Sequence, residues 1–209
     1  MKQSLKAIRR RGRLASPGDS ANEWVKTAMP TFVSRAGQKL DFALATWQID
    51  VRDKVCADLG CNAGGFVDCL LQRGAARIYA VDTGYGMLAW KLRNDPRVVV
   101  MERTNAIHAT LPQKVDLVSI DVAWTRQRHI LPAARRMLAD DGIVVSLIKP
   151  HYEAHPRLLR KGVLPPEQMD SVIEKVKADI RACDFELSAT LPSPIKGAKG
   201  NLELLALLR

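Results

Sequence analysis

The chain has 209 residues, of which 47% are hydrophobic, and carries a formal net charge of +10 at pH 7, with a pI ≈ 9.7. This length is enough to bury the core of one domain and excludes two domains of ordinary size. No apolar run approaches the ~18 residues of a membrane span. The excess of positive charge favours a polyanionic partner without choosing between RNA, DNA and an acidic membrane.

Residues 1–30 differ from the rest of the chain in charge. Before the first acid, Asp19, the basic residues are Lys2, Lys6, Arg9, Arg10, Arg11 and Arg13. We interpret residues 1–30 as a basic arm or linker ahead of a catalytic domain over residues 31–209, and a solvated tail is the alternative. The arm lacks the apolar segment of a secretory signal, so we expect a cytoplasmic protein, although an Arg-rich, acid-poor start leaves a mitochondrial address open.

Alternating helices and strands are predicted from residue 35 onward. Ser34 is the predicted cap of an amphipathic helix over 35–47. The elements that follow are strand 54–59, helix 65–73, strand 76–82, helix 86–93, strands 97–101 and 115–121, helix 126–139, strand 142–148, helix 166–182, and strands near 184–191 and 202–208. This pattern predicts an α/β fold with a doubly wound, mostly parallel, seven-stranded sheet. The last two strands have no long helix between them, which predicts an antiparallel C-terminal hairpin.

The turn after the first strand predicts a nucleotide-cofactor site. Its sequence is Asp58-Leu59-Gly60-Cys61-Asn62-Ala63-Gly64-Gly65-Phe66. Asp82 ends the next strand, about 20 positions after Gly60, where a carboxylate can accept hydrogen bonds from both hydroxyls of a ribose. An acid directly before the first glycine disfavours the pyrophosphate of a nicotinamide dinucleotide and favours the cationic groups of S-adenosylmethionine. We therefore predict S-adenosylmethionine, and the alternative is a glycine-rich turn without a ligand.

Two polar residues directly follow apolar strands further along the chain. Asp121 ends the predicted strand 115–121, and Lys149 follows the strand 142–148. Ligands bind at the carboxyl ends of the strands in such a sheet, so both residues are candidates for the site. A lysine at the rim of a buried strand either reaches solvent or has a function there.

The cysteines predict neither a disulfide nor a zinc site, because Cys56, Cys61, Cys69 and Cys183 include no Cys-x-x-Cys pair. Cys61 is the exception of interest. It lies at the start of a predicted helix, where the helix N-terminus is expected to lower the pKa of a thiol. A bound cofactor is expected to cover it.

Several segments together carry a family resemblance: Ser34-Arg35-Ala36-Gly37-Gln38-Lys39-Leu40, Asp58-Leu59-Gly60 with Gly64-Gly65-Phe66, Ala80-Val81-Asp82-Thr83-Gly84-Tyr85-Gly86, Glu102-Arg103-Thr104-Asn105, Lys149-Pro150-His151-Tyr152-Glu153 and Gly200-Asn201-Leu202-Glu203. In this order they resemble the FtsJ-like RNA methyltransferases of the haemolysin A (TlyA) type, over roughly residues 31–209. A series of ordered motifs is far more specific than a lone glycine loop.

The resemblance implies 2′-O-methylation of ribose, with ribosomal RNA or a ribosomal subunit as the partner. It places the catalytic tetrad on Lys39, Asp121, Lys149 and Glu203, with Lys149 as the base or the orienting group for the ribose hydroxyl. The implied cofactor contacts are Asp58, Gly60, Cys61, Asn62, Gly64, Gly65, Phe66, Asp82, Thr83, Asn105 and Asp121. Asn105 is assigned to the adenine edge, with a turn cap as the alternative, and Tyr85 is a further candidate for the adenosine pocket.

Departures from the family pattern concern RNA capture. Members usually carry an N-terminal S4 RNA-binding domain, and residues 1–30 are too short for one. The remaining candidates are the arm, another chain, or the basic residues Arg126, Arg128, Arg157, Arg160 and Lys161. Trp124 stands where small and apolar residues are usual, and it is expected either to stack on an unpaired base or to pack in the core.

The leading hypothesis is thus a cytoplasmic, S-adenosylmethionine-dependent RNA ribose 2′-O-methyltransferase that does not act on a membrane. The runner-up is a non-catalytic RNA-binding protein that retains the cofactor fold, and an intact tetrad argues against it. A cytolysin, as the family label suggests, is the third reading, and no amphipathic insertion helix is evident in the sequence.

Overall fold

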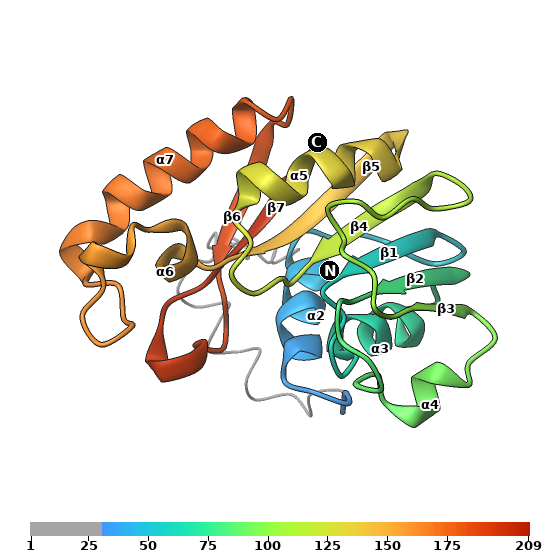
Figure 1. Ribbon diagram of the computed structural model, residues 1–209. Coiled ribbons are helices and arrows are strands. Elements are labelled where there is room, and N and C mark those ends of the chain that lie inside the picture. Colours follow the sequence, from blue (N-terminus) through green and yellow to red (C-terminus); the bar gives the residue numbers. More distant parts are fainter. Residues whose placement is uncertain (1–30) are drawn as a thin grey trace, which may run out of the picture. The chain divides into compact units, whose positions relative to one another are not determined.

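The computed structural model describes residues 31–209, so the basic arm proposed for residues 1–30 lies outside the described residues (Figure 1). The strands are β1 (Val55–Leu59), β2 (Arg77–Val81), β3 (Val98–Met101), β4 (Val115–Ile120), β5 (Leu138–Ile148), β6 (Leu187–Pro192) and β7 (Leu204–Leu208). They form one sheet in the order β3-β2-β1-β4-β5-β7-β6. The first five strands are parallel, and β7 runs antiparallel between β5 and β6. The predicted sheet and its C-terminal hairpin are confirmed.

Helices cover both faces of this sheet. They are α2 (Ala36–Thr46), α3 (Gly65–Gln72), α4 (Trp90–Arg93), α5 (Gln127–Met137), α6 (Pro150–Glu153) and α7 (Met169–Arg181), with short 3-10 turns at Pro156–Leu158, Pro166–Gln168 and Ala198–Gly200. Figure 1 shows α2 and α3 on one face and α5 and α7 on the other. This is the doubly wound arrangement, in which ligands bind at the carboxyl edge of the strands.

The register of the central strands brings three site segments together. β1 and β4 are apolar and buried nearly throughout, as expected for strands covered on both faces. Leu59 at the end of β1 pairs with Val81 of β2 and with Ile120 of β4. The residues that follow these three strand ends, Gly60, Asp82 and Asp121, therefore emerge side by side.

Several predicted boundaries were wrong. The helix predicted over 86–93 is limited to α4, because Gly86 has a φ of 71° and its N–H donates to Glu102 Oε1 instead of to a helical carbonyl. The strand predicted over 142–148 begins earlier, at Leu138, with an irregularity in its pairing with β4. The helix predicted over 166–182 begins with a 3-10 turn, and α6 was not predicted.

Ser34 is not a side-chain cap. Helix α2 begins after Arg35, whose φ and ψ of −57° and −24° are already helical, and no side chain caps it. The Ser34 carbonyl accepts a hydrogen bond from Gly37 N at 3.2 Å. Its hydroxyl instead lies against Gly65 at the start of α3, so it contributes to the packing of α2 on α3.

Candidate active site

Two adjoining cavities lie at the carboxyl edge of the sheet. One has a volume of about 310 Å³ and lies between the ends of β1, β2 and β4. The other has a volume of about 200 Å³ and reaches from the end of β1 to the start of α2 and to Lys149. Both are lined by Gly60, Asn62, Asp121 and Ala123, so they form one continuous cleft. We call the first the outer cavity and the second the inner cavity.

The glycine-rich turn allows this close assembly. Gly60 has a φ of 89°, and a Cβ on it would lie 2.8 Å from the carbonyl oxygen of Asp121. A Cβ on Gly65 would lie 2.8 Å from Gly37 N, so the start of α3 fits against the start of α2 only without a side chain. Gly64, with a φ of 94°, faces Leu88 and Leu92 and lines neither cavity. Gly64 therefore serves the turn that leads into α3.

Asp58 lines the inner cavity with an unusual carboxyl group. Its Oδ1 accepts a hydrogen bond from Ser119 Oγ at 2.8 Å, and its Oδ2 is buried without a partner among residues 31–209. Burial, followed by the nearby Asp121 and Asp82 carboxylates, raises the pKa of Asp58 to about 8, although the Ser119 hydrogen bond acts in the opposite direction. An orphaned buried carboxyl group is complementary to a cation that enters the cavity.

Asp82 lies in the outer cavity and is held rigidly by backbone amides. Its Oδ2 accepts from Asn62 N at 2.8 Å and its Oδ1 from Gly84 N at 2.7 Å. Each carboxylate oxygen retains a lone pair for another donor, such as a ribose hydroxyl. Thr83 and Asn105 line the same cavity, and Asn105 Oδ1 also accepts from Ile107 N at 3.0 Å. The turn cap proposed as the alternative for Asn105 is therefore confirmed, and its adenine contact stays a prediction.

Cys61 and Phe66 line the inner cavity, but the expected lowering of the Cys61 pKa was wrong. Burial raises the pKa of the Cys61 thiol, and the nearby carboxylates of Asp58 and Asp82 raise it further. These effects outweigh the helix N-terminus. Burial likewise raises the pKa of Cys56 to about 12, and all four cysteines of the chain are free thiols.

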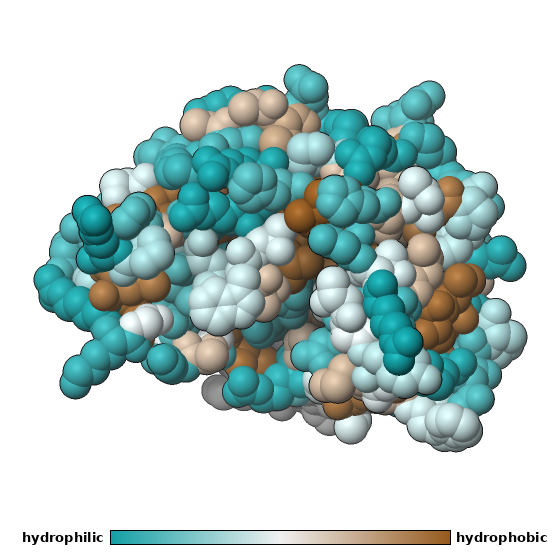
Figure 2. Space-filling model, viewed as in Figure 1, coloured by the Kyte–Doolittle hydropathy of each residue, from teal (hydrophilic) through white to brown (hydrophobic). Residues whose placement is uncertain are grey.

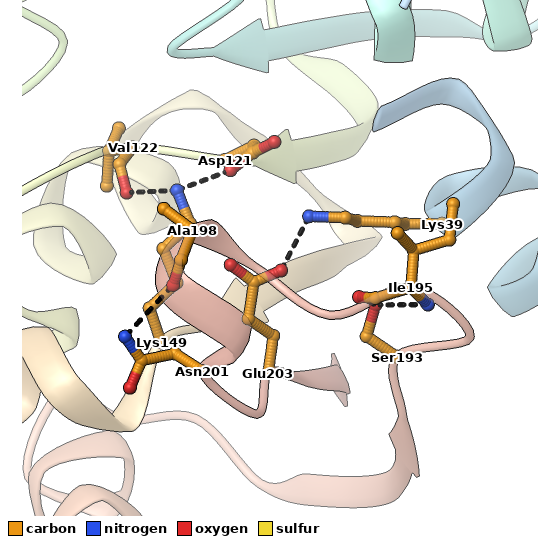
Figure 3. A network of polar contacts seen from close by, with 9 residues as sticks. All are labelled: Lys39, Asp121, Val122, Lys149, Ser193, Ile195, Ala198, Asn201 and Glu203. Atoms are coloured by element: carbon orange, nitrogen blue, oxygen red, sulfur yellow. Dashed lines mark hydrogen bonds and ion pairs between the residues drawn. The ribbon is translucent and has the colours of Figure 1, made fainter. Parts of the chain in front are cut away.

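The residues of the tetrad meet as two ion pairs beside the inner cavity (Figure 3). Lys39 Nζ lies 2.5 Å from Glu203 Oε2, although the two residues are 164 positions apart. Lys149 Nζ lies 2.7 Å from Asp121 Oδ1 and donates to the Val122 carbonyl at 3.1 Å. Figure 3 shows all four charged groups directed into one space between α2, the ends of β4 and β5, and the β6–β7 hairpin. The structure thus brings the predicted tetrad together.

Glu203 depends on the hairpin between β6 and β7. Its carbonyl accepts from Ser193 N at 2.9 Å, and Gly197 N donates to the Asn201 carbonyl at 2.9 Å. A Cβ on Gly197 would overlap the Glu203 carboxylate. The hairpin therefore closes over Glu203 and holds it against Lys39.

Glu153 is a structural contributor that the sequence analysis did not single out. Its Oε1 accepts from Gln127 N at 2.8 Å, and Gln127 Oε1 accepts from Ser146 Oγ at 2.8 Å. These bonds tie α6, which follows Lys149, to the start of α5 and to β5. Burial raises the pKa of Glu153. The only sign of this role in the sequence is that Glu153 lies in the motif that begins at Lys149. An acidic residue near a motif is often exposed to solvent, so its position alone does not predict burial.

Trp124 projects at the rim of the outer cavity. Its side chain is 81% exposed, its φ is 62°, and its ring centroid lies 4.6 Å from that of Tyr152. Core packing, one of the two expectations for Trp124, was therefore wrong. Tyr85 is also exposed and does not line the cavity, while Arg126 is half-buried and donates to the Ala154 carbonyl at 3.3 Å.

Within residues 31–209, no group of three His, Cys, Asp or Glu side chains is arranged to hold a metal ion. Among the helices of residues 31–209, none is long and apolar enough to cross a membrane.

Comparisons with known proteins give this geometry a family context. The family model described as FtsJ-like methyltransferase matches residues 32–209. The chain is 38% identical to the 16S/23S rRNA (cytidine-2'-O)-methyltransferase TlyA of Mycobacterium tuberculosis, over 85% of this chain and 68% of the relative.

Solved structures agree with this match. A protein from Streptococcus thermophilus, provisionally named a hemolysin, has a TM-score of 0.83 at 39% identity and covers 88% of this chain and 68% of its own. Fibrillarin of Aeropyrum pernix, solved with bound S-adenosyl-L-methionine, has a TM-score of 0.58 at 18% identity, over 80% of this chain and 74% of its own. At that identity the likeness to fibrillarin shows the fold alone.

Proposed function

The chain belongs to the FtsJ-like methyltransferase family, and we propose that it methylates the 2′-hydroxyl of a ribose in ribosomal RNA. The observation that carries this proposal is the meeting of two Lys–carboxylate pairs beside a cleft at the carboxyl edge of the sheet. The relative from Mycobacterium tuberculosis bears the name of a ribosomal RNA 2'-O-methyltransferase. S-adenosylmethionine is the cofactor, and it supplies a methyl group activated by a positively charged sulfur.

The cleft fits that cofactor in both charge and shape. The buried, unpartnered Oδ2 of Asp58 suits the ammonium group of the methionine end in the inner cavity. Asp82, fixed by Asn62 N and Gly84 N, suits the ribose hydroxyls in the outer cavity. The glycine turn at Gly60 lets the backbone approach the ligand closely. The methionine end is thus assigned to the inner cavity and the ribose to the adjoining outer cavity, which matches their connection in the cofactor.

Lys149 is placed to orient the hydroxyl group that accepts the methyl group. An ammonium has three N–H donors, and Lys149 directs two of them to Asp121 and to the Val122 carbonyl. The third is left for a ribose oxygen. Of the two roles implied for Lys149, this geometry favours orienting the hydroxyl over removing its proton. Such positioning lowers the barrier by pre-organising the reacting oxygen.

The cleft also has a place for an unpaired base. Trp124 is exposed at the rim of the outer cavity and leans on Tyr152, so a flat apolar surface stands next to the tetrad. Aromatic side chains bind single-stranded RNA by stacking on its bases. We therefore assign Trp124 to the base of the target nucleotide. Four free thiols suit a reducing compartment, and on that ground we place the enzyme in the cytoplasm.

Methyl transfer to RNA tests the proposal. The purified protein is incubated with methyl-labelled S-adenosylmethionine and either free ribosomal RNA or ribosomal subunits, beside a Lys149→Ala variant and a Lys175→Ala control on α7. We expect label on the RNA that resists alkaline cleavage, is lost with Lys149→Ala and is retained with Lys175→Ala. Cofactor binding without any label on RNA or subunits would instead identify a non-catalytic RNA-binding protein.

A further inference from the structure

Two segments without acidic residues lie side by side next to the tetrad. Residues 154–166 follow α6, and residues 187–202 form β6 and the hairpin that leads to Glu203. Asn201, which is buried, joins them: its Nδ2 donates to the Gly162 carbonyl at 3.0 Å, and its Oδ1 accepts from Leu164 N at 3.2 Å. Figure 1 shows the two loops, orange and red, running next to each other below α6.

The two segments expose a group of basic side chains. We call this group the basic lip, and it consists of Arg157, Arg160, Lys161, Lys196 and Lys199. Arg160 pairs with Glu167 at 2.9 Å, and the other four have no carboxylate partner within residues 31–209. Figure 2 shows hydrophilic side chains projecting from this corner of the molecule. Four unpaired cations on adjoining loops make a surface suited to a polyanion.

Both loops place a lysine at the tip of a tight turn. Lys161 and Gly162 have φ values of 53° and 83°, and Lys199 and Gly200 have φ values of 56° and 78°. Arg160 and Val163 close the first turn with a pair of backbone hydrogen bonds. Turns with two positive φ values strongly prefer Asn or Gly at the first position, so a lysine there is costly for folding. Lys199 Nζ also donates to the Lys161 carbonyl at 3.4 Å, so the two tips lie against each other.

The basic lip is fixed relative to the tetrad. Asn201 lies two residues before Glu203, and the hairpin that bears Lys199 closes over the Glu203 carboxylate through Gly197. A chain bound along the lip would therefore run close to the Lys39 and Glu203 pair. The spacing between charged loops and tetrad is set by hydrogen bonds, so the lip can position the chain as well as attract it.

We propose that the basic lip binds the phosphate backbone of the substrate RNA and leads it into the cleft between Glu203 and Trp124. The inference rests on the proposed function, since it identifies the surface that captures RNA for methylation. It also assigns capture to the domain over residues 31–209, where no S4 domain is present in the described fold.

The test compares two variants that lose the same charge. The lip variant carries Lys161→Asn and Lys199→Asn, because asparagine tolerates the left-handed conformation and so preserves both turns. The control carries Arg77→Gln, at the amino end of β2, and Arg181→Gln, at the far end of α7 from the lip. For each, the affinity for a fluorescein-labelled single-stranded RNA is measured over a range of salt concentrations, and cofactor affinity and thermal unfolding are recorded.

Affinity for RNA falls as salt rises, and each phosphate contact on a single strand adds about 0.7 to the steepness of log affinity against log salt. If both lysines contact phosphates, the plot for the lip variant is therefore less steep by about 1.4. The control slope should change far less, and cofactor affinity and unfolding temperature should hold. An unchanged slope in the lip variant, an equal fall in the control, or displacement of the RNA by polyglutamate as readily as by unlabelled RNA would overturn the inference. If the protein methylates RNA but the lip variant has the same salt dependence as wild type, only the role of the basic lip is refuted. If the salt dependence changes in the lip variant but the protein methylates no RNA, only the proposed reaction is refuted.

Discussion

Replacing Asp58 by asparagine tests whether the inner cavity holds a carboxyl group that is uncharged before the cofactor binds. Burial raises the pKa of Asp58 from 3.8 to about 8. An acid with a higher pKa in the folded than in the unfolded state binds extra protons on folding, so its effect on stability is absent below the unfolded pKa and grows as pH rises towards the folded pKa. At about 1.4 kcal/mol per pH unit, Asp58 lowers the free energy of unfolding by about 3 kcal/mol between pH 5 and pH 7.

Denaturant unfolding of the cofactor-free protein measures this effect. The free energy of unfolding of Asp58→Asn minus that of wild type should be larger near pH 7 than near pH 5 by about 3 kcal/mol, because only the wild type loses stability over this range. The substitution Asp141→Asn, at an exposed aspartate, is the matched control. The same Asp58→Asn change should weaken S-adenosylmethionine binding. Wild-type cofactor affinity should rise with pH up to about 8, because a bound cation displaces the proton. A relative stability that is equal at the two pH values would refute the reasoning.

Three further predictions concern the tetrad and its hairpin. Lys149→Met should lower the rate of methyl transfer by about 10²-fold, because the ribose hydroxyl is no longer oriented, while cofactor affinity, measured by calorimetry, is unchanged. Lys39→Met should destabilise the protein by about 3 kcal/mol because it leaves Glu203 buried and unpaired, whereas the double variant Lys39→Met/Glu203→Met should recover stability in denaturant unfolding but not activity. Gly197→Ala should reduce methyl transfer with little loss in unfolding temperature, since its φ of −72° suits alanine but its Cβ would displace the Glu203 carboxylate; normal activity would contradict the assigned hairpin role.

The architecture follows from sequence patterns that are local and physically simple. Apolar strands such as Val115–Ile120 are recognisable because both faces are buried, and their ends place Asp82 and Asp121 at a common edge. The boundaries that failed depend on tertiary contacts. Gly86 leaves the predicted helix because Glu102, in the turn after β3, accepts a hydrogen bond from its N–H. The sequence near Gly86 gives no sign of that bond.

The sequence predicted that four charged residues meet, but it did not predict how they pair. Motif resemblance assigned Lys39, Asp121, Lys149 and Glu203, and the structure joins each lysine to one carboxylate. Which lysine meets which carboxylate depends on the β6–β7 hairpin, whose path cannot be read from spacing. The shift of the Cys61 thiol was predicted in the wrong direction because burial and neighbouring carboxylates, both tertiary properties, outweigh the local helix end.

The position of the transferred methyl group tests the central claim most directly. Ribosomal RNA incubated with the protein and S-adenosylmethionine would be digested to nucleosides and analysed by mass spectrometry, beside RNA treated with the Lys149→Met variant. If the two ion pairs form a ribose-methylating site, the new methyl group is on the 2′-oxygen and is absent from the variant sample. A methyl group on a base, or ribose methylation that survives Lys149→Met, would contradict it.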